Sequence, residues 1–260
     1  MANAWIIAPL PIVDVIAAAD AGHAGLNVAN DYAGVIWRAP LNPGGVVQLI
    51  LDIGQMASFD TVALFGVRFT GSAGALNFYT RSAPGEAWTL VAPAQPVFAG
   101  AQSLADGRGV SLFAADQLIV NRQVLIEVYS ATAGFVEVAR AVIGARIVLE
   151  RNFSFGASIG VKDLGSLEFS RRGVLLRASG AKLRTVALTF SSARKTEVEA
   201  MTQPLFERIG NTECVALVTD PAPDVMRQRR CYFGPLVGDL SQTWRRADAW
   251  EAKVNLVSAF

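Results

Sequence analysis

The chain has 260 residues, of which 52% are hydrophobic and 17% are charged, and its formal net charge is +1. This length suits one large or two ordinary domains, and the low charged fraction predicts a sizeable core with apolar surface left over for a partner. No stretch is typical of a membrane-spanning helix, and the first residues lack the basic segment of a secretory signal. Two cysteines are too few for a disulfide framework or a zinc site, so free, buried thiols are expected.

Short strands separated by turns are predicted over residues 1–144. In the first clear strand, at 46–54, every second residue is apolar, which is the period of a half-buried strand; these residues are Val47, Leu49, Leu51 and Ile53. Further strands are predicted at 61–66, 77–82, 124–129 and 135–138, and a long loop at 93–109. Many short strands at regular spacing favour a β-sandwich.

A domain boundary is predicted near Gly144, within about five residues. There the regular strands give way to the polar and aromatic connector Arg151–Gly156. The predicted domains are therefore residues 1–144 and 145–260.

The second domain is predicted to hold further strands and one helix at about 193–209. Val198, Met201, Leu205 and Ile209 follow helical spacing, and Gly210 ends the run. Ser191 or Ser192 is expected to cap the helix, and Pro204 to kink or break it. The predicted fold class is all-β, with two β-sandwich domains, the second carrying one inserted α-helix.

Several motifs of residues 1–144 resemble the discoidin-type, galactose-binding-like β-sandwich. They are Asn30-Asp31-Tyr32, Trp37-Arg38, the strands at 46–54 and 61–66, the segment 77–82, and Trp88. The resemblance implies a recognition module rather than a catalyst. Tyr32, Trp37 and Trp88, with Arg38, are its candidate ligand-binding residues, since aromatic faces suit a pyranose ring; packing in the core is the alternative for Trp37. The resemblance also leaves open a bound calcium ion.

The order of elements in residues 145–260 resembles the distal tail proteins of long-tailed phages, which form rings. The residues that carry this likeness are 151–156, 170–173, the helix, 234–236 and 250–256. The resemblance implies a structural virion protein in the phage tail that joins the tail tube to hub, tip or fibre proteins. It would be made in the host cytoplasm and form a cyclic homo-oligomer, expected to be a hexamer, with a trimer as the alternative.

Catalysis is not expected. Residues 156–160 match the G-x-S-x-G pattern around Ser158, but no convincing helix follows it, and the single histidine, His23, precedes it. One histidine cannot build the usual metal site, and the acids Asp52 and Asp60 do not belong to a dense run of calcium ligands. We therefore expect no enzyme activity, no metal and no cofactor.

Charge is divided unevenly along the chain. Residues 1–144 carry 6 basic and 10 acidic side chains, whereas residues 145–260 carry 17 and 12. Either the two domains simply differ in charge, or unlike faces meet in an assembly. Arg229, Arg230, Arg245 and Arg246 are either solvated turns or intersubunit contacts. The basic residues are scattered, so neither nucleic-acid binding nor membrane insertion is expected. The main hypothesis is thus an assembly protein of the phage tail, and the alternative is a carbohydrate-binding module or lectin that recognises a host glycan.

Overall fold

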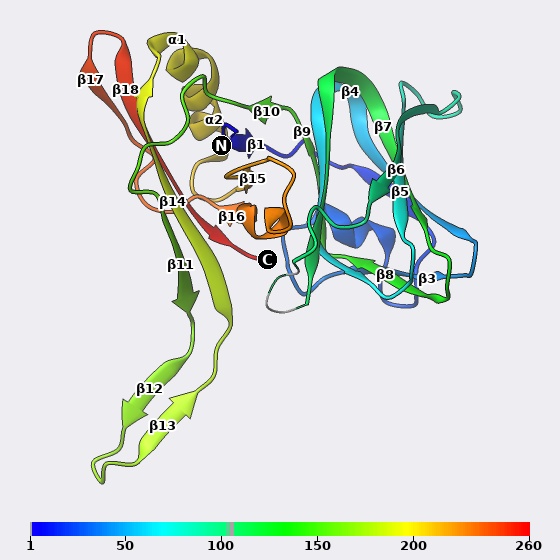
Figure 1. The fold of residues 1–260 in the computed structure, drawn as a ribbon, viewed down its shortest axis with the longest axis horizontal. Helices are drawn as coiled ribbons and strands as arrows, with labels where there is room; N and C mark the ends of the chain where they lie inside the picture. The colour runs from blue at the N-terminus through cyan, green and yellow to red at the C-terminus, as the bar shows by residue number, and fades with distance from the viewer. Residues whose placement is uncertain (1, 103, 105–106) are drawn as a thin grey trace. The chain divides into compact units, whose positions relative to one another are not determined.

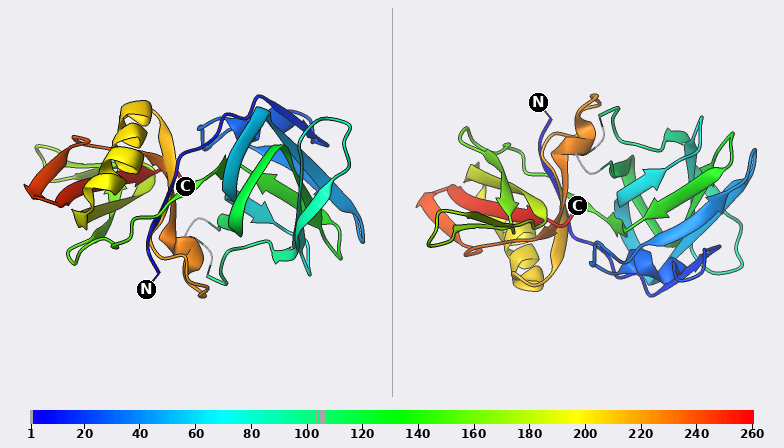
Figure 2. Two further views of the ribbon diagram at one scale, coloured as in Figure 1. Left: turned by 90° about the horizontal axis from the view of Figure 1, so that it is seen from above. Right: turned by 90° about the horizontal axis from the view of Figure 1, so that it is seen from below.

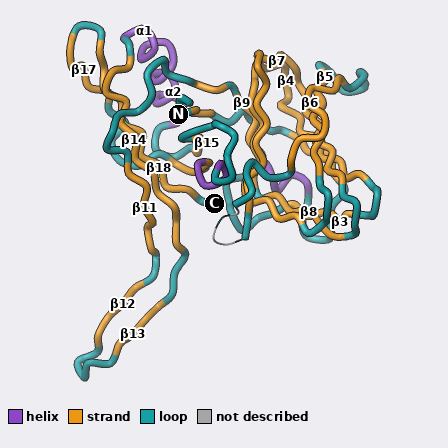
Figure 3. The backbone as a smooth tube through the Cα atoms, in the orientation of Figure 1, coloured by secondary structure: helices purple, strands orange, loops and turns teal. Residues whose placement is uncertain are grey.

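The computed structural model describes residues 2–102, 104 and 107–260. The chain divides into two compact units. Unit 1 comprises the chain up to Val148 together with Ala216–Cys231, and unit 2 comprises Leu149–Val215 together with Tyr232–Phe260. The chain first passes from unit 1 to unit 2 after Val148, close to the predicted boundary. The segment 216–231 then belongs to unit 1 again, which differs from the predicted division. Strands dominate both units, so the predicted mainly β fold class is confirmed (Figures 1 and 3).

Unit 1 is built from short strands and two very long ones. The long strands are β4 (Val46–Phe69) and β7 (Gly109–Tyr129), which pair antiparallel along most of their length. The short strands are β1 (Trp5–Ile7), β2 (Asp14–Ala17), β3 (Trp37–Leu41), β5 (Ala75–Arg81), β6 (Thr89–Pro96), β8 (Gly134–Val138), β9 (Arg140–Gly144) and β10 (Arg146–Ile147). Because β6 runs to Pro96, the predicted loop over 93–109 begins later; its positions 103, 105 and 106 lie outside the described residues.

An eight-stranded antiparallel sheet forms the body of unit 1. Its main path is β3-β8-β4-β7-β5-β6, and β2 and β9 also pair with β4. The pairing of β4 with β7 shifts register three times, first between Asp52 and Ala57. Gly54 lies at that shift with a φ of +89°, a conformation that a residue with a side chain rarely adopts. The bulges allow the long strand β4 to pair with several neighbouring strands. The sheet therefore curves around its core (Figure 2).

The core of unit 1 confirms the predicted alternation. Val47, Leu49, Leu51 and Ile53 are all buried. Trp37, which has no exposed surface, belongs to the same core cluster. Residues of β5, β7, β8 and β9 also belong to it. Outside this sheet, β1 pairs antiparallel with β10 on one side and with β15 (Cys214–Val218) on the other.

Unit 2 contains a four-stranded antiparallel sheet and a helical segment. The sheet order is β11-β14-β18-β17, formed by β11 (Ser158–Asp163), β14 (Lys182–Ala193), β18 (Ala249–Ser258) and β17 (Gln242–Arg246). A further two-stranded sheet pairs β12 (Ser166–Phe169) with β13 (Leu175–Ala178), and β16 spans Cys231–Pro235. The buried side chains Val186, Leu188, Phe190, Ala252, Val254 and Leu256 come from β14 and β18, where two long strands pair.

The predicted helix at 193–209 is present as three consecutive pieces. They are α1 (Lys195–Glu197), a π-helical turn (Val198–Thr202) and α2 (Gln203–Ile209), and they lie beside β17 and β18 (Figure 2). Pro204 sits in the first turn of α2, where its missing N–H costs least. The wider π turn before it is the break that the proline predicted.

The predicted serine cap is wrong. Both Ser191 and Ser192 belong to β14, and the Ser191 hydroxyl bonds to that of Ser154 instead. Arg194 is the N-cap residue, and the Glu197 carboxylate accepts its backbone N–H at 2.9 Å. Glu197 also accepts the backbone N–H of Glu150 at 2.6 Å, so one acid fixes both the helix start and the connector.

Candidate functional site

The outer part of the β11–β14 hairpin, residues 163–182, is called the arm here. It contains β12 and β13 and the turn between them (Figure 3). None of its residues is buried. Its exposed large apolar side chains are Leu164, Leu167, Phe169, Val174, Leu175 and Leu176, each between 50% and 69% exposed. On β11, the neighbouring Ile159 and Val161 are exposed as well.

The strand register places three of these apolar side chains on one face of the arm. Leu167 lies opposite Arg177, and Phe169 lies opposite Leu175. Directly opposite residues of an antiparallel pair point to the same side of the sheet, so Leu167, Phe169 and Leu175 form one apolar face bordered by Arg177. The other face carries Ser166, Glu168, Leu176 and Ala178.

The turn of the arm is fixed by local hydrogen bonds. The Ser170 N–H donates to the Val174 carbonyl at 2.8 Å, and the Ser170 hydroxyl accepts the N–H groups of Arg172 and Val174. Gly173 provides the positive φ, +75°, that the turn requires. The arm is therefore an ordered hairpin, although a two-stranded hairpin is only marginally stable in water without a covered face.

The β12 and β13 strands pair only with each other among the described residues. Their outer edges thus present unpaired backbone donors and acceptors, which can pair with another chain. The arm combines these free edges with an apolar face. An exposed apolar patch of this kind marks an interaction site more often than a catalytic one.

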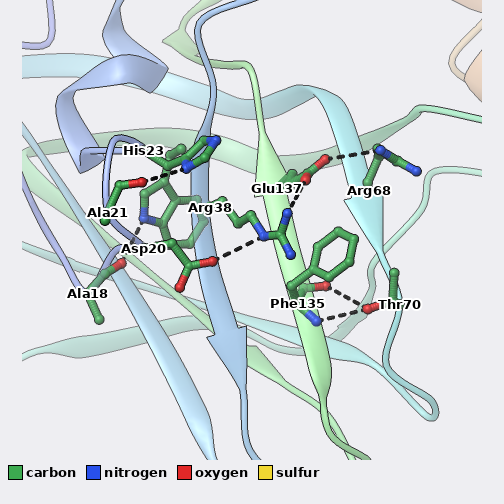
Figure 4. Close-up of polar contacts among 10 residues, drawn as sticks. Ala18, Asp20, Ala21, His23, Arg38, Arg68, Thr70, Phe135 and Glu137 are labelled. Carbon is green, nitrogen blue, oxygen red and sulfur yellow. Dashed lines mark hydrogen bonds and ion pairs between the residues drawn. The ribbon is translucent and has the colours of Figure 1, made fainter.

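The predicted ligand residue Arg38 lies in a charged cluster of unit 1 (Figure 4). Its guanidinium pairs with Asp20 at 3.1 Å and with Glu137 at 3.4 Å, and it stacks on the Phe135 ring at 4.0 Å. Glu137 is nearly buried and also pairs with Arg68 at 3.6 Å. The positive charge of Arg38 is thus already balanced within the unit, between β3 and β8.

The three predicted aromatic residues do not form one platform. Trp37 has no exposed surface, and its indole N–H donates to the Ala18 carbonyl at 2.8 Å, so it packs in the core and cannot stack on a sugar. The Tyr32 ring is 73% exposed. Trp88 is half-buried in the connection between β5 and β6, where the Arg81 guanidinium lies 4.1 Å from its ring. The ligand-binding role of Tyr32 and Trp88 stays a prediction.

The four predicted intersubunit arginines lie in different settings. Arg230 pairs with Asp220 at 3.2 Å, and Arg245 makes two bonds to the Glu251 carboxylate at 3.0 and 3.1 Å. Those bonds lower the pKa of Glu251. Arg229 is exposed in a 3-10 turn of unit 1, and Arg246 is exposed beside the β17–β18 turn.

No catalytic arrangement surrounds Ser158. It is the first residue of β11 and is followed by strand, not by the helix that a nucleophile elbow needs. His23 is in unit 1 and its ring contacts the Ala21 carbonyl (Figure 4). Among the described residues, no three His, Cys, Asp or Glu side chains are grouped to hold a metal ion, and neither Cys214 nor Cys231 forms a disulfide.

The two acids considered as calcium ligands are held by protein groups. Asp60 pairs with Arg146 at 3.0 Å. Asp52 accepts bonds from Arg122 at 2.8 and 3.0 Å, from the Gly54 N–H at 2.7 Å and from the Gln123 amide at 2.6 Å. Burial alone would raise the pKa of Asp52, but the bonds from Arg122, Gly54 and Gln123 outweigh it and lower the pKa below its ordinary 3.8.

The arm is the feature that the sequence did not reveal as a site. Both of its strands were predicted, and Ser170–Gly173 between them is typical of a turn. Periodicity, however, shows only which residues share a face. It cannot show whether another segment of the chain covers that face.

No helix among the described residues is long and apolar enough to cross a membrane.

No protein family and no curated protein matches the chain. Solved structures with a similar fold include chitosan-binding module 1 from a Paenibacillus sp. IK-5 chitosanase/glucanase, with 10% identity and a TM-score of 0.41 over 52% of this chain and 98% of that one. They also include the CBM32 of AlyQ in complex with 4,5-unsaturated mannuronic acid, with 15% identity and a TM-score of 0.40 over 52% and 97%. A third is CBM32-1 from a family 31 glycoside hydrolase of Clostridium perfringens, with 12% identity and a TM-score of 0.40 over 52% and 96%. At these identities and scores the likeness assigns neither a family nor a ligand to this chain.

Proposed function

We propose that this protein is a structural subunit that assembles in several copies and uses the arm of unit 2 as its main contact. The observation that carries this proposal is the exposed apolar face of Leu167, Phe169 and Leu175 on an ordered hairpin. Covering such a face removes apolar surface from water at about 25 cal/mol per Å², which favours association. A catalytic role has no comparable support, since Ser158 is followed by a strand and not by the helix of a nucleophile elbow.

A second copy of the chain is the proposed occupant of the arm. Counted over the two units, unit 1 carries 10 basic and 12 acidic side chains, and unit 2 carries 13 and 10. Opposite charges favour contact between unlike faces and oppose contact between like faces, which is the heterologous contact of a closed ring. The proposed assembly is a cyclic homo-oligomer, a hexamer or else a trimer.

The sequence resemblance of residues 145–260 to distal tail proteins suggests which assembly this is. The proposed setting is the virion of a long-tailed phage, in a ring at the distal tail or baseplate, with the tail tube, hub or fibre proteins as neighbours. Unit 1 would then extend from the ring as a recognition module.

Substitution of the apolar face of the arm tests the proposal. The double variant Leu167→Ser with Phe169→Ser should shift the protein toward the monomer at every concentration, because it replaces apolar contact surface with hydroxyl groups. The measurement is light scattering coupled to size-exclusion chromatography over a concentration series. The matched control is Leu118→Ser with Val120→Ser, since these side chains of β7 in unit 1 are 61% and 55% exposed.

The control should keep the wild-type mass. A wild-type monomer at all concentrations, together with its absence from every cyclic layer of a tail particle, would contradict the assembly. An equal loss in both double variants would show that the arm is not the main contact.

Glycan binding by unit 1 is the second candidate. It is favoured by the 73% exposed ring of Tyr32, which adjoins Asp31, held in place by its ion pair with Arg140 at 3.0 Å. An exposed aromatic ring can stack on a sugar. A glycan array with wild-type protein and Tyr32→Ala tests it; binding that survives the substitution would remove Tyr32 from the site.

A further inference from the structure

A second feature of unit 2, away from the arm, is a cavity of about 740 Å³ whose wall includes four cations. Three segments form its wall. Arg151 comes from the connector before β11; Arg194, Lys195 and Thr196 come from the start of the helical segment; and Arg246–Ala249 form the β17–β18 turn. All of its charged side chains are exposed.

Two of the four cations have no partner of opposite charge. Arg194 pairs with Glu150 at 2.6 Å, and Lys195 pairs with Glu199 at 3.6 Å. In the part of the chain that the structure describes, Arg151 and Arg246 make no ion pair. Asp248 is the single acid in the wall. The four cations outnumber the single acid of the wall, so the cavity carries an excess of positive charge.

An exposed tryptophan is hydrogen-bonded to the backbone of the β17–β18 turn, which forms part of the cavity wall. The Trp244 ring is 63% exposed and stacks on Trp250, with 5.8 Å between ring centroids and an interplanar angle of 4°. Its indole N–H donates to the backbone carbonyl of Arg246 at 2.6 Å. The tryptophan thus fixes the backbone that presents Arg246 and leaves an apolar surface beside it.

We propose that this cavity binds a carboxylate-rich segment of a partner protein. The planar guanidinium groups of Arg151 and Arg246 can each bind a carboxylate with two hydrogen bonds, which a lysine cannot do. Trp244 offers an apolar anchor beside them, and tryptophan and arginine are the residues that most often dominate binding energy at interfaces.

Nucleic acid fits the same surface less well. Its charges follow one another closely along a backbone and call for a row of cations, whereas these cations are gathered in one hollow with Asp248 among them. Separate carboxylates on a flexible segment can contact the arginines and avoid Asp248. This inference does not depend on self-assembly through the arm.

The test is binding of a fluorescein-labelled peptide with four Gly-Glu repeats, followed by fluorescence anisotropy. Binding should be measurable at low ionic strength and should weaken steeply by about 0.3 M salt, since exposed charges are screened over shorter distances as salt rises. Arg151→Ala with Arg246→Ala should weaken binding by about tenfold or more, the loss expected when charge-assisted contacts are removed. Trp244→Ala should weaken it with no change in the salt dependence.

The matched control is Arg171→Ala with Arg172→Ala, which removes the same charge from the exposed turn of the arm. It should change the affinity by less than about twofold, because those arginines lie outside the cavity. Thermal melting of each variant checks that it folds. Absence of binding, an equal loss in both double variants, or tighter binding of a single-stranded oligonucleotide of equal charge would overturn the proposal.

Discussion

Two short strands of this protein have similar compositions, one arginine among apolar or small residues, and opposite surroundings. In unit 1, β9 reads Arg-Ala-Val-Ile-Gly, and all five of its residues are buried. In unit 2, β13 reads Leu-Leu-Arg-Ala, and all four of its residues are exposed. The strand β9 pairs with β4, and its Ala141 and Ile143 belong to the core, whereas β13 pairs only with β12. Burial is thus set by the neighbours of a strand and not by its own composition.

The comparison also separates two uses of apolar side chains. In unit 1 they hold the fold together, so replacing them should lower the free energy of unfolding. In the arm they are at least half exposed, so replacing them should change the free energy of unfolding little. Three substitutions test this difference between the core of unit 1 and the arm.

The largest effect is expected for Trp37→Ala in the core of unit 1. Trp37 is fully buried, and the substitution removes its packing, leaves a cavity and frees the Ala18 carbonyl. The free energy of unfolding should fall by about 3–5 kcal/mol. Urea denaturation followed by circular dichroism measures it, with the exposed Tyr32→Ala as control. Equal effects of the two substitutions would contradict the assigned core.

A smaller effect is expected for Asp52→Asn, which weakens the bonds to Arg122, Gln123 and Gly54. The free energy of unfolding at neutral pH should fall by about 2 kcal/mol, the order expected for hydrogen bonds to a charged group. Because the folded-state pKa of Asp52 is lowered below 3.8, its contribution is present above about pH 4 and is lost as the pH falls through that lowered pKa.

The wild type and Asp52→Asn should therefore converge in stability below pH 4. Urea denaturation at several pH values between about 2 and 7 follows this convergence across the ordinary aspartate range. The control is Asp116→Asn, since Asp116 is exposed on β7. A difference between wild type and Asp52→Asn that stayed constant down to the lowest pH would exclude the lowered pKa.

The smallest effect is expected in the arm. The Leu167→Ser, Phe169→Ser protein should unfold within about 0.5 kcal/mol of the wild type when both are dilute monomers, as is usual for exposed positions. The same substitutions are expected to change the mass of the assembled form. If they destabilise the monomer as much as a core substitution does, then the arm is covered within its own chain and the contrast with unit 1 fails.

Much of the fold followed from local patterns. The period of two in 46–54 predicted the buried face of β4, because each side chain on one face meets the same core. The spacing of Val198, Met201, Leu205 and Ile209 predicted the helical segment. Three of these side chains are buried, but Met201, in the π-helical turn, is 41% exposed and does not join the buried face. The helix cap was wrong because Ser191 and Ser192 are held in β14, and the capping bond comes from the Glu197 side chain instead.

The sites were harder to predict, for a physical reason. Trp37 could serve the core or a ligand, and only the sheet register places it inside. The cavity joins Arg151, Lys195 and Arg246 from three distant segments, so no local pattern unites them. Whether a charged or apolar side chain is exposed depends on which distant segments pack over it. The local sequence pattern does not contain that information.

The pairing of β1 has a consequence for how the chain folds as it is made. Ile6 pairs with Ile147 on one side and with Leu217 on the other, about 210 residues along the chain. A nascent chain that ends before β15 therefore holds β1 with one free edge, although Ile6 and Ile7 are buried in the finished protein. Contacts between such distant residues form slowly, and exposed strand edges favour misassembly. During synthesis β1 therefore leaves the ribosome about 210 residues before its second partner, β15.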